Sequence, residues 1–187
     1  YSTGVVTALD ADDFSAINSF AFSGNLTGGT FNIENEDKLT LLATTTDMDI
    51  RPVLDSGTDV VNLTLDAEAA SSTHGDIDAT QSETINIESV ADEDLANTNT
   101  ITALDVQNNT KINITGDADL TATTATGTEL TIDASAATGD VSITVVGGND
   151  AITLGSGDDT AVGGAGADTI DGGAGDDSIT GGAGDDV

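Results

Sequence analysis

The tail of the chain, residues 147–187, repeats every nine residues and constrains the fold more than any other stretch. Two complete copies read GGAGADTID (163–171) and GGAGDDSIT (172–180), with partial copies before them from residue 145 and after them from residue 181. Each copy combines a glycine-rich turn, an aspartate at position six and one apolar residue at position eight. The period runs for about five copies and weakens upstream.

A nine-residue period of this composition predicts very short strands joined by tight turns. Glycine lets the backbone adopt the positive φ angles that tight turns need, and a triplet with one inward apolar residue forms a short strand. Two repeats then form one coil. Coils stacked at about 4.8 Å pair each strand in parallel with the strand eighteen residues later, so the tail is predicted to be a β-solenoid.

Stacked turns also stack their aspartates. Like charges at this separation repel by roughly 1 kcal/mol in water and several times more in a drier environment, so a cation is expected between successive turns. Carboxylate and carbonyl oxygens suit Ca²⁺ better than the smaller, octahedral Mg²⁺. The alternative is a flexible, unliganded Gly/Asp linker, against which the strict spacing of the position-six aspartates argues. The position-five aspartates are expected to face solvent; they are Asp158, Asp176 and Asp185.

These residues resemble the RTX nonapeptide repeat, the calcium-binding β-roll of bacterial proteins secreted by type I systems. The resemblance implies that each calcium ion lies between two turns eighteen residues apart, held by position-six aspartates and by carbonyls of positions one to four. Carried over by position, the aspartate pairs are Asp150 with Asp168, Asp159 with Asp177, and Asp168 with Asp186. The implied carbonyl ligands are Gly155, Gly157, Gly163, Gly164, Ala165, Gly166, Gly172, Gly173, Ala174 and Gly175.

The charge of the whole chain is extreme. Its formal net charge is −31, with only three Lys and Arg residues, so nucleic acids and anionic lipid surfaces are poor partners. A chain this acidic is either disordered or neutralised by bound cations, and the 37% of hydrophobic residues, arranged in short alternating runs, favour an ordered, calcium-bound chain. No apolar segment is long enough to span a bilayer as a helix.

Residues 1–144 are predicted to form irregular strand repeats that continue into the tail as one parallel β-solenoid. The fold class is therefore all-β: a parallel β-helix or β-solenoid over 1–144 that ends in an RTX calcium-binding β-roll over 145–187, cut short at its C-terminus. A core of small aliphatic ladders suits a chain with only 3% aromatic residues and no cysteine. The phenylalanines are expected in the core or in a cap over the first coil; they are Phe14, Phe20, Phe22 and Phe31.

Two further residues leave alternatives open. Asp59, with Gly57 and Val61 around it, matches repeat positions six, four and eight, which indicates either a solitary degenerate calcium turn or an ordinary turn. His74 is the sole histidine, and with no cysteine or neighbouring nucleophile it is expected to be a loop residue rather than a metal ligand or catalytic base. No H-E-x-x-H or G-x-S-x-G motif occurs, and the chain is not expected to be an enzyme.

The resemblance extends upstream. The segments SGTDVVNLTLDAEAA, ETINIES, NTITALDVQNNTKINITGDADLTAT and TIDASAATGDVSITV are similar to the strand repeats of RTX surface-layer (S-layer) proteins of Gram-negative bacteria. That resemblance implies a structural protein that leaves the cell by type I secretion and self-assembles into a calcium-dependent lattice at the cell surface. The implied partners are identical subunits, with any glycan or lipopolysaccharide anchor outside this segment. Leftover carboxylates such as Asp10, Asp76 and Asp78 could share ions between neighbouring subunits.

Three alternatives remain. The chain could be a module of an RTX adhesin, or the calcium-dependent folding domain of a larger secreted enzyme whose catalytic part precedes Tyr1, since the chain reads as a portion of something longer. Ice binding through flat threonine rows ranks last, because the threonines in TATTATG and ATTTD do not recur at one coil spacing.

Overall fold

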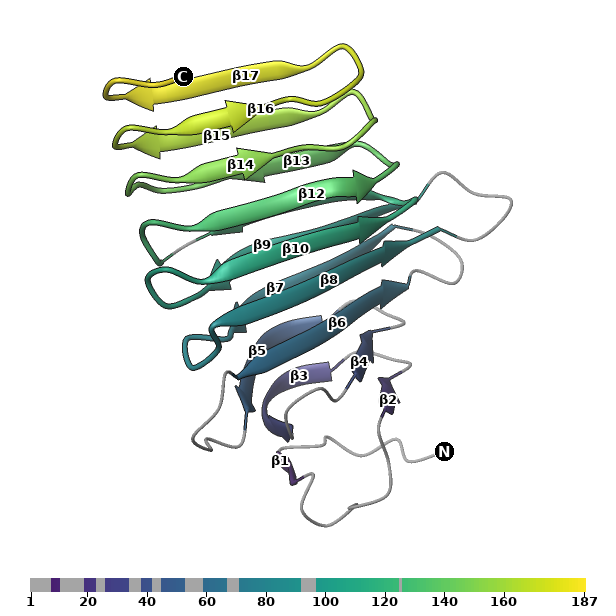
Figure 1. The fold of residues 1–187 in the computed structure, drawn as a ribbon. Helices are drawn as coiled ribbons and strands as arrows, with labels where there is room; N and C mark the ends of the chain where they lie inside the picture. The colour runs from purple at the N-terminus through teal and green to yellow at the C-terminus, as the bar shows by residue number, and fades with distance from the viewer. Residues whose placement is uncertain are drawn as a thin grey trace.

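Two parallel β-sheets face each other and form a β-solenoid, as Figure 1 shows. The structure is a computed structural model that describes residues 8–10, 19–22, 26–33, 38–41, 45–52, 59–66, 71–91, 97–124 and 126–187. Every described element is a strand, and the described part of the chain contains no helix of the length and hydropathy needed to cross a membrane. The predicted all-β, parallel solenoid is confirmed.

Successive strands alternate between the two sheets. The nine-stranded sheet contains, in spatial order, β1 (Ala8–Asp10), β3 (Leu26–Ile33), β5 (Thr45–Pro52), β7 (Ser72–Asp78), β9 (Thr98–Asp105), β11 (Asp119–Thr124), β13 (Val141–Thr144), β15 (Thr160–Ala165) and β17 (Ser178–Ala183). The eight-stranded sheet contains β2 (Ser19–Phe22), β4 (Lys38–Leu41), β6 (Val60–Asp66), β8 (Thr84–Val90), β10 (Lys111–Gly116), β12 (Thr131–Ala137), β14 (Ala151–Thr153) and β16 (Thr169–Asp171).

Coil length varies along the chain and becomes constant at eighteen residues in the tail. In the tail each strand pairs with the strand eighteen residues later, as β14 does with β16 through Ala151 and Thr169, which confirms the predicted spacing. Upstream, hydrogen-bonded positions in neighbouring coils are 24 residues apart between Asn62 and Asn86 and 27 apart between Asn86 and Asn113. Both sheets continue across residue 145, and the division of the chain at 144/145 stays a prediction.

The core is built from ladders of aliphatic side chains. On the eight-stranded sheet one ladder runs through Val61, Ile85, Ile112, Ile132, Ile152 and Ile170, each residue in register with the next. The first five are at most 2% exposed. Burying each such isoleucine contributes about 1.5–3 kcal/mol. The short tail strand β14 has the pattern exposed, buried, exposed around Ile152, as the nine-residue repeat predicted.

His74 lies inside this core, so its prediction as a loop residue was wrong. It is in β7, fully buried, and its Nε2 lies 2.8 Å from the hydroxyl of Ser72. Ser72 donates a hydrogen bond to the Oδ1 of Asn99, whose Nδ2 donates to the hydroxyl of Ser89 in the opposite sheet. Burial lowers the pKa of His74 to about 4. A polar network satisfied inside the solenoid therefore explains a histidine that the sequence pattern could not place.

Hydroxyl side chains form columns on the outer face of the nine-stranded sheet. One column, in register over six strands, consists of Thr73, Thr100, Thr121, Ser142, Thr160 and Ser178. A second column consists of three threonines and one valine: Thr123, Thr144, Val162 and Thr180. The threonines of TATTATG and ATTTD were not expected to recur at one coil spacing, and the first column joins positions 18 to 27 residues apart. Coils of unequal length nevertheless bring these residues into register.

Two predictions cannot be compared with the structure. The side chains of Phe14, Phe20, Phe22 and Phe31 lie outside the described residues, and so does the side chain of Asp10. The capping role of the phenylalanines therefore stays a prediction.

Candidate metal centre

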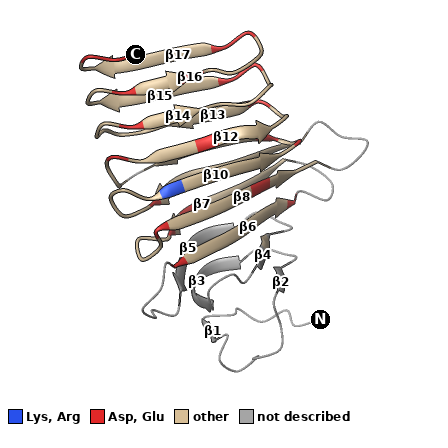
Figure 2. Cartoon of the chain, viewed as in Figure 1, with Lys and Arg blue, Asp and Glu red and all other residues tan. Residues whose placement is uncertain are grey.

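The glycine-rich turns stack at the two edges of the solenoid, where Figure 2 shows acidic residues in successive turns. Asp150 and Asp168 directly precede β14 and β16, and Asp186 follows β17 on the same edge. Asp159 and Asp177 directly precede β15 and β17 on the opposite edge. The structure thus places the members of each predicted aspartate pair in neighbouring coils.

Each position-six aspartate is anchored to the coil before it by its carboxylate. The backbone N–H of Asp150 donates to the Oδ1 of Asp168 at 2.9 Å, and the N–H of Asp168 donates to the Oδ1 of Asp186 at 3.1 Å. On the other edge the N–H of Asp159 donates to the Oδ1 of Asp177 at 3.0 Å. One oxygen of each downstream carboxylate is therefore used by the backbone, which leaves the Oδ2 as the oxygen available to a ligand.

The Oδ2 atoms of Asp150 and Asp168 are buried and have no hydrogen-bond partner. These residues are 2% and 1% exposed. A buried carboxylate oxygen without a partner is costly, because it loses its hydration and gains nothing in return. The Oδ2 of Asp159 differs, since it accepts a hydrogen bond from the N–H of Gly155 at 3.1 Å. The edge that carries Asp150 and Asp168 therefore fits a cation better than the edge that carries Asp159.

The glycine at position one of each repeat leaves the space that the Oδ2 of the position-six aspartate occupies. A Cβ on Gly163 would collide with the Oδ2 of Asp168, and a Cβ on Gly181 would collide with the Oδ2 of Asp186. At position four, Gly166 has a φ of +139°, and a Cβ there would collide with the backbone carbonyl oxygen of Gly148 in the preceding coil. Glycine is needed at these positions because carboxylate and carbonyl oxygens approach its Cα closely.

The buried carboxylates on the edge that carries Asp150 and Asp168 create an electrostatic environment that favours a bound cation. Burial raises the pKa of Asp150, and the negative charges of Asp168 and Glu129 raise it further, against the hydrogen bond that the N–H of Leu130 donates. A raised carboxyl pKa means that the ionised form is disfavoured where it stands. A bound cation would reverse this effect by offsetting both the burial and the repulsion.

The position-five residues have a structural role that the sequence interpretation missed. Asp158 and Asp176 are exposed, as predicted. However, the Oδ1 of Asp158 accepts a hydrogen bond from the N–H of Asp176 at 2.9 Å, and the Oδ1 of Asn149 accepts one from the N–H of Ala167 at 2.8 Å. Position five thus bonds to the following coil, and position six bonds to the preceding one. The recurrence of Asp or Asn at position five was the available signal.

An upstream turn repeats part of this arrangement. The backbone N–H of Asp59, directly before β6, donates to the Oε2 of Glu83 in the next coil at 2.7 Å. Asp59 is 4% exposed. This hydrogen bond to the next coil resembles that from Asp150 to Asp168, although Asp59 and Glu83 are 24 residues apart and Asp150 and Asp168 are 18 apart. The degenerate calcium turn and the ordinary turn both stay predictions for this segment.

The donor set of the tail fits calcium. Among the described residues, no group of three or more His, Cys, Asp or Glu side chains could hold a metal ion, so two carboxylates per site would need backbone carbonyls to complete the shell. One implied carbonyl, that of Gly155, accepts a hydrogen bond from the N–H of Ala174 and keeps its second lone pair. Bound calcium would supply the positive charge between the turns, and the individual ligands stay predictions.

Comparison with protein families identifies the repeat. The family model of the RTX calcium-binding nonapeptide repeat (4 copies) matches residues 135–161 and 153–187. Neither the comparison with curated proteins nor the comparison with solved structures returned a match. Repeats of this family bind calcium, and proteins that carry them are typically secreted. Residues 135–187 of the chain are therefore RTX-type repeats that form a calcium-binding structural domain.

Proposed function

We propose that the chain is a non-catalytic structural subunit of a bacterial surface layer, secreted by a type I system and assembled with identical copies outside the cell. The observation that carries this proposal is the contrast between the charge of the chain and the face of its nine-stranded sheet. With a net charge of −31, two copies repel each other in most orientations. A subunit that tiles needs a face on which this repulsion is small.

The two hydroxyl columns supply such a face. From Thr100 to Ser178 and from Thr123 to Thr180, no member of either column carries a charge. The eight-stranded sheet carries Glu88, Lys111 and Asp133 on β8, β10 and β12, and Figure 2 shows charged residues on these strands. The acidic residues Asp76, Asp78 and Asp105 of the nine-stranded sheet lie outside the two columns, towards the C-terminal ends of β7 and β9. Flat, uncharged hydroxyl columns can pack against a second copy and exchange hydrogen bonds with it.

Calcium dependence follows from the tail. The tail coils bury little apolar surface, since a short strand such as β14 contributes a single inward aliphatic residue, Ile152, so the position-six aspartates must be neutralised before the turns stack stably. The solenoid that carries the two columns is then rigid only when calcium is bound in its turns. Ion sharing through exposed carboxylates such as Asp76 remains a second mode of contact in the same proposal.

Electron microscopy of the purified chain tests the proposal. We expect ordered sheets in negative stain with millimolar calcium and single particles in EGTA. Thr121→Glu or Thr160→Glu, each placing a charge in the first column, should abolish the sheets without changing the circular dichroism spectrum. Thr131→Glu on the eight-stranded sheet, exposed and in register with Lys111 and Ala151, is the matched control. Particles that remain single at every calcium concentration would contradict the proposal.

The same columns favour one other function, ice binding. Regularly spaced threonine methyl and hydroxyl groups, with strands about 4.8 Å apart, present a repeating surface on which water can order. Ice-crystal shaping by the calcium-loaded monomer, lost in Thr121→Glu, would favour this function over tiling. Sheets in the microscope without any effect on ice growth would favour the surface layer.

A further inference from the structure

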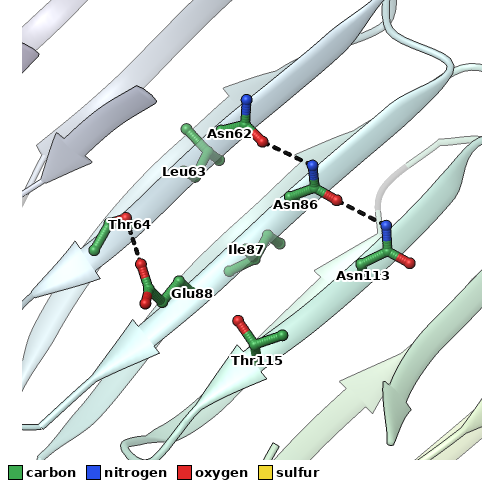
Figure 3. Close-up of a pocket in the computed structure, with 8 residues that line it drawn as sticks. All are labelled: Asn62, Leu63, Thr64, Asn86, Ile87, Glu88, Asn113 and Thr115. Carbon is green, nitrogen blue, oxygen red and sulfur yellow. Dashed lines mark hydrogen bonds between the residues drawn. The ribbon is translucent and has the colours of Figure 1, made fainter. Parts of the chain in front are cut away.

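The outer face of the eight-stranded sheet contains a groove across β6, β8 and β10, shown in Figure 3. Its volume is about 430 Å³, within the range of small-ligand sites. One wall is a row of asparagines, the other wall is Thr64, Glu88 and Thr115, and Leu63 and Ile87 lie between the two walls. The groove is remote from the glycine-rich turns and is not used by the proposed assembly face.

The asparagines form a hydrogen-bonded ladder. The Nδ2 of Asn86 donates to the Oδ1 of Asn62 at 2.7 Å, and the Nδ2 of Asn113 donates to the Oδ1 of Asn86 at 2.7 Å. The ladder ends at Asn113, because the next residue in register is Asp133, another acceptor. All three carboxamides are thereby held in one orientation, which pre-organises them for a ligand.

The asparagine ladder leaves hydrogen-bond donors and acceptors of Asn86 and Asn113 unused. Asn86 uses one of its two N–H donors and one lone pair of its Oδ1, so one donor and one lone pair remain. Asn113 keeps its second N–H and its carbonyl oxygen. On the opposite wall the hydroxyl of Thr64 donates to the Oε2 of Glu88 at 3.1 Å, and Thr115 adds a second hydroxyl. Donors and acceptors therefore alternate along the groove.

This alternation selects a class of ligand. A hard cation such as Ca²⁺ or Mg²⁺ needs oxygen ligands, and the ladder places amide N–H groups, which cannot ligate a cation, between the amide oxygens. An anion would be repelled by Glu88 and by the net charge of the chain. A hydroxyl group both donates and accepts, so a neutral molecule with many hydroxyls matches both walls. We propose that this groove binds a neutral saccharide through the carboxamides of Asn86 and Asn113 and the hydroxyl of Thr115.

The affinity is expected to be modest. All aromatic residues of the chain precede residue 59, so no aromatic ring is available in this groove for a sugar to stack on. Binding would rest on hydrogen bonds that replace those with water, each with a net contribution of about 1 kcal/mol. Dissociation constants in the millimolar range are therefore expected for a short oligosaccharide.

Titration by ¹H–¹⁵N NMR tests the proposal on the calcium-loaded chain. The probes are maltohexaose, cellohexaose and chitohexaose, with hexagalacturonate as the anionic comparison. We expect at least one neutral probe to shift the side-chain amide signals of Asn86 and Asn113 in a saturable way, while hexagalacturonate leaves them unchanged.

Two variants and one control complete the test. Asn113→Ala and Thr115→Val should each weaken binding by roughly tenfold, the loss of about one ligand hydrogen bond. Thr153→Val, on the same sheet but outside the groove, should bind as the wild type does. Circular dichroism in calcium confirms that each variant is folded. The proposal is overturned if no neutral probe shifts the two amides, if hexagalacturonate shifts them instead, or if both groove variants bind normally.

Discussion

Asp168 belongs to two predicted ion sites, one shared with Asp150 and one with Asp186, so its replacement tests the calcium interpretation directly. Asp168→Asn keeps the Oδ1 that accepts the N–H of Asp150 and removes one negative charge. The change should have opposite consequences with and without calcium. Without the ion it removes repulsion between stacked carboxylates, and with the ion it removes a charged ligand.

The size of the first effect follows from the stacking distance. Carboxylates in successive coils are about 5 Å apart, and at this distance two unit charges repel by about 0.8 kcal/mol in water and about 3 kcal/mol at an effective dielectric constant of 20. Because Asp168 is only 1% exposed, the upper part of this range applies. In EGTA the variant should therefore be at least as stable as the wild type.

The second effect follows from binding linkage. Calcium at about 100 times the dissociation constant stabilises a one-site protein by about 2.7 kcal/mol, and a hundredfold weaker site leaves about 0.4 kcal/mol. Asp168→Asn should thus lose about 2 kcal/mol of the calcium-induced stability at each site that it serves. The two effects have opposite signs, which separates the loss of a ligand from a general loss of packing.

Urea unfolding followed by circular dichroism, in EGTA and at a series of calcium concentrations, measures both effects. Asp158→Asn is the matched control, since it removes the same charge from an exposed position-five residue and keeps the Oδ1 that accepts the N–H of Asp176. Only Asp168→Asn should shift the calcium midpoint strongly. The reasoning is refuted if both variants respond to calcium alike, or if Asp168→Asn is destabilised equally in EGTA and in calcium.

Three further predictions concern pH and packing. Because the folded pKa of Asp150 is raised, this residue stabilises the calcium-free chain below about pH 4, and that stabilisation is lost as the pH rises through the folded pKa. In urea titrations in EGTA, Asp150→Asn should remove the part of the pH dependence of the unfolding free energy that Asp150 contributes. The pKa of His74 falls from 6.5 to about 4, so stability is lost as pH falls through this interval, by about 3 kcal/mol in total; His74→Gln should flatten the curve, and an unchanged curve would contradict the burial argument. Gly166→Ala adds a Cβ at a φ of +139° against the carbonyl of Gly148 and should cost more than about 2 kcal/mol in calcium, whereas Ser156→Ala on an exposed turn should change the unfolding midpoint little.

Much of the fold could be predicted because the tail has a strict period. Two nonapeptides per coil fix an eighteen-residue register, so Asp150 with Asp168 and Asp168 with Asp186 could be paired from residue numbers alone, and the structure places them in neighbouring coils. The same arithmetic fails upstream, where Asn86 and Asn113 are 27 apart and Asn62 and Asn86 are 24 apart. Turns of different lengths accommodate these differences at a small cost in loop-closure entropy, so sequence spacing does not predict which residues pair in this part of the chain.

His74 shows a second limit of the sequence. A histidine in SSTHGDID has the neighbours of a loop residue, yet Ser72 and Asn99 give it a buried network in which its neutral form is stable. Those partners come from different strands, 27 residues apart between Ser72 and Asn99. Nothing local in the chain could have indicated their proximity.

The sequence by itself determined the repeating turn, the inward position of one aliphatic residue per tail strand and the acidic content that requires a cation, because each of these depends on residues within two neighbouring repeats. Only the tertiary structure decided which carboxylate oxygens are buried without a partner, how Thr100 and Thr121 align on one face, and how three asparagines form one wall of a groove. Those features depend on the lateral register of coils with unequal lengths. That register is set by packing of the aliphatic ladders in the core rather than by any local pattern.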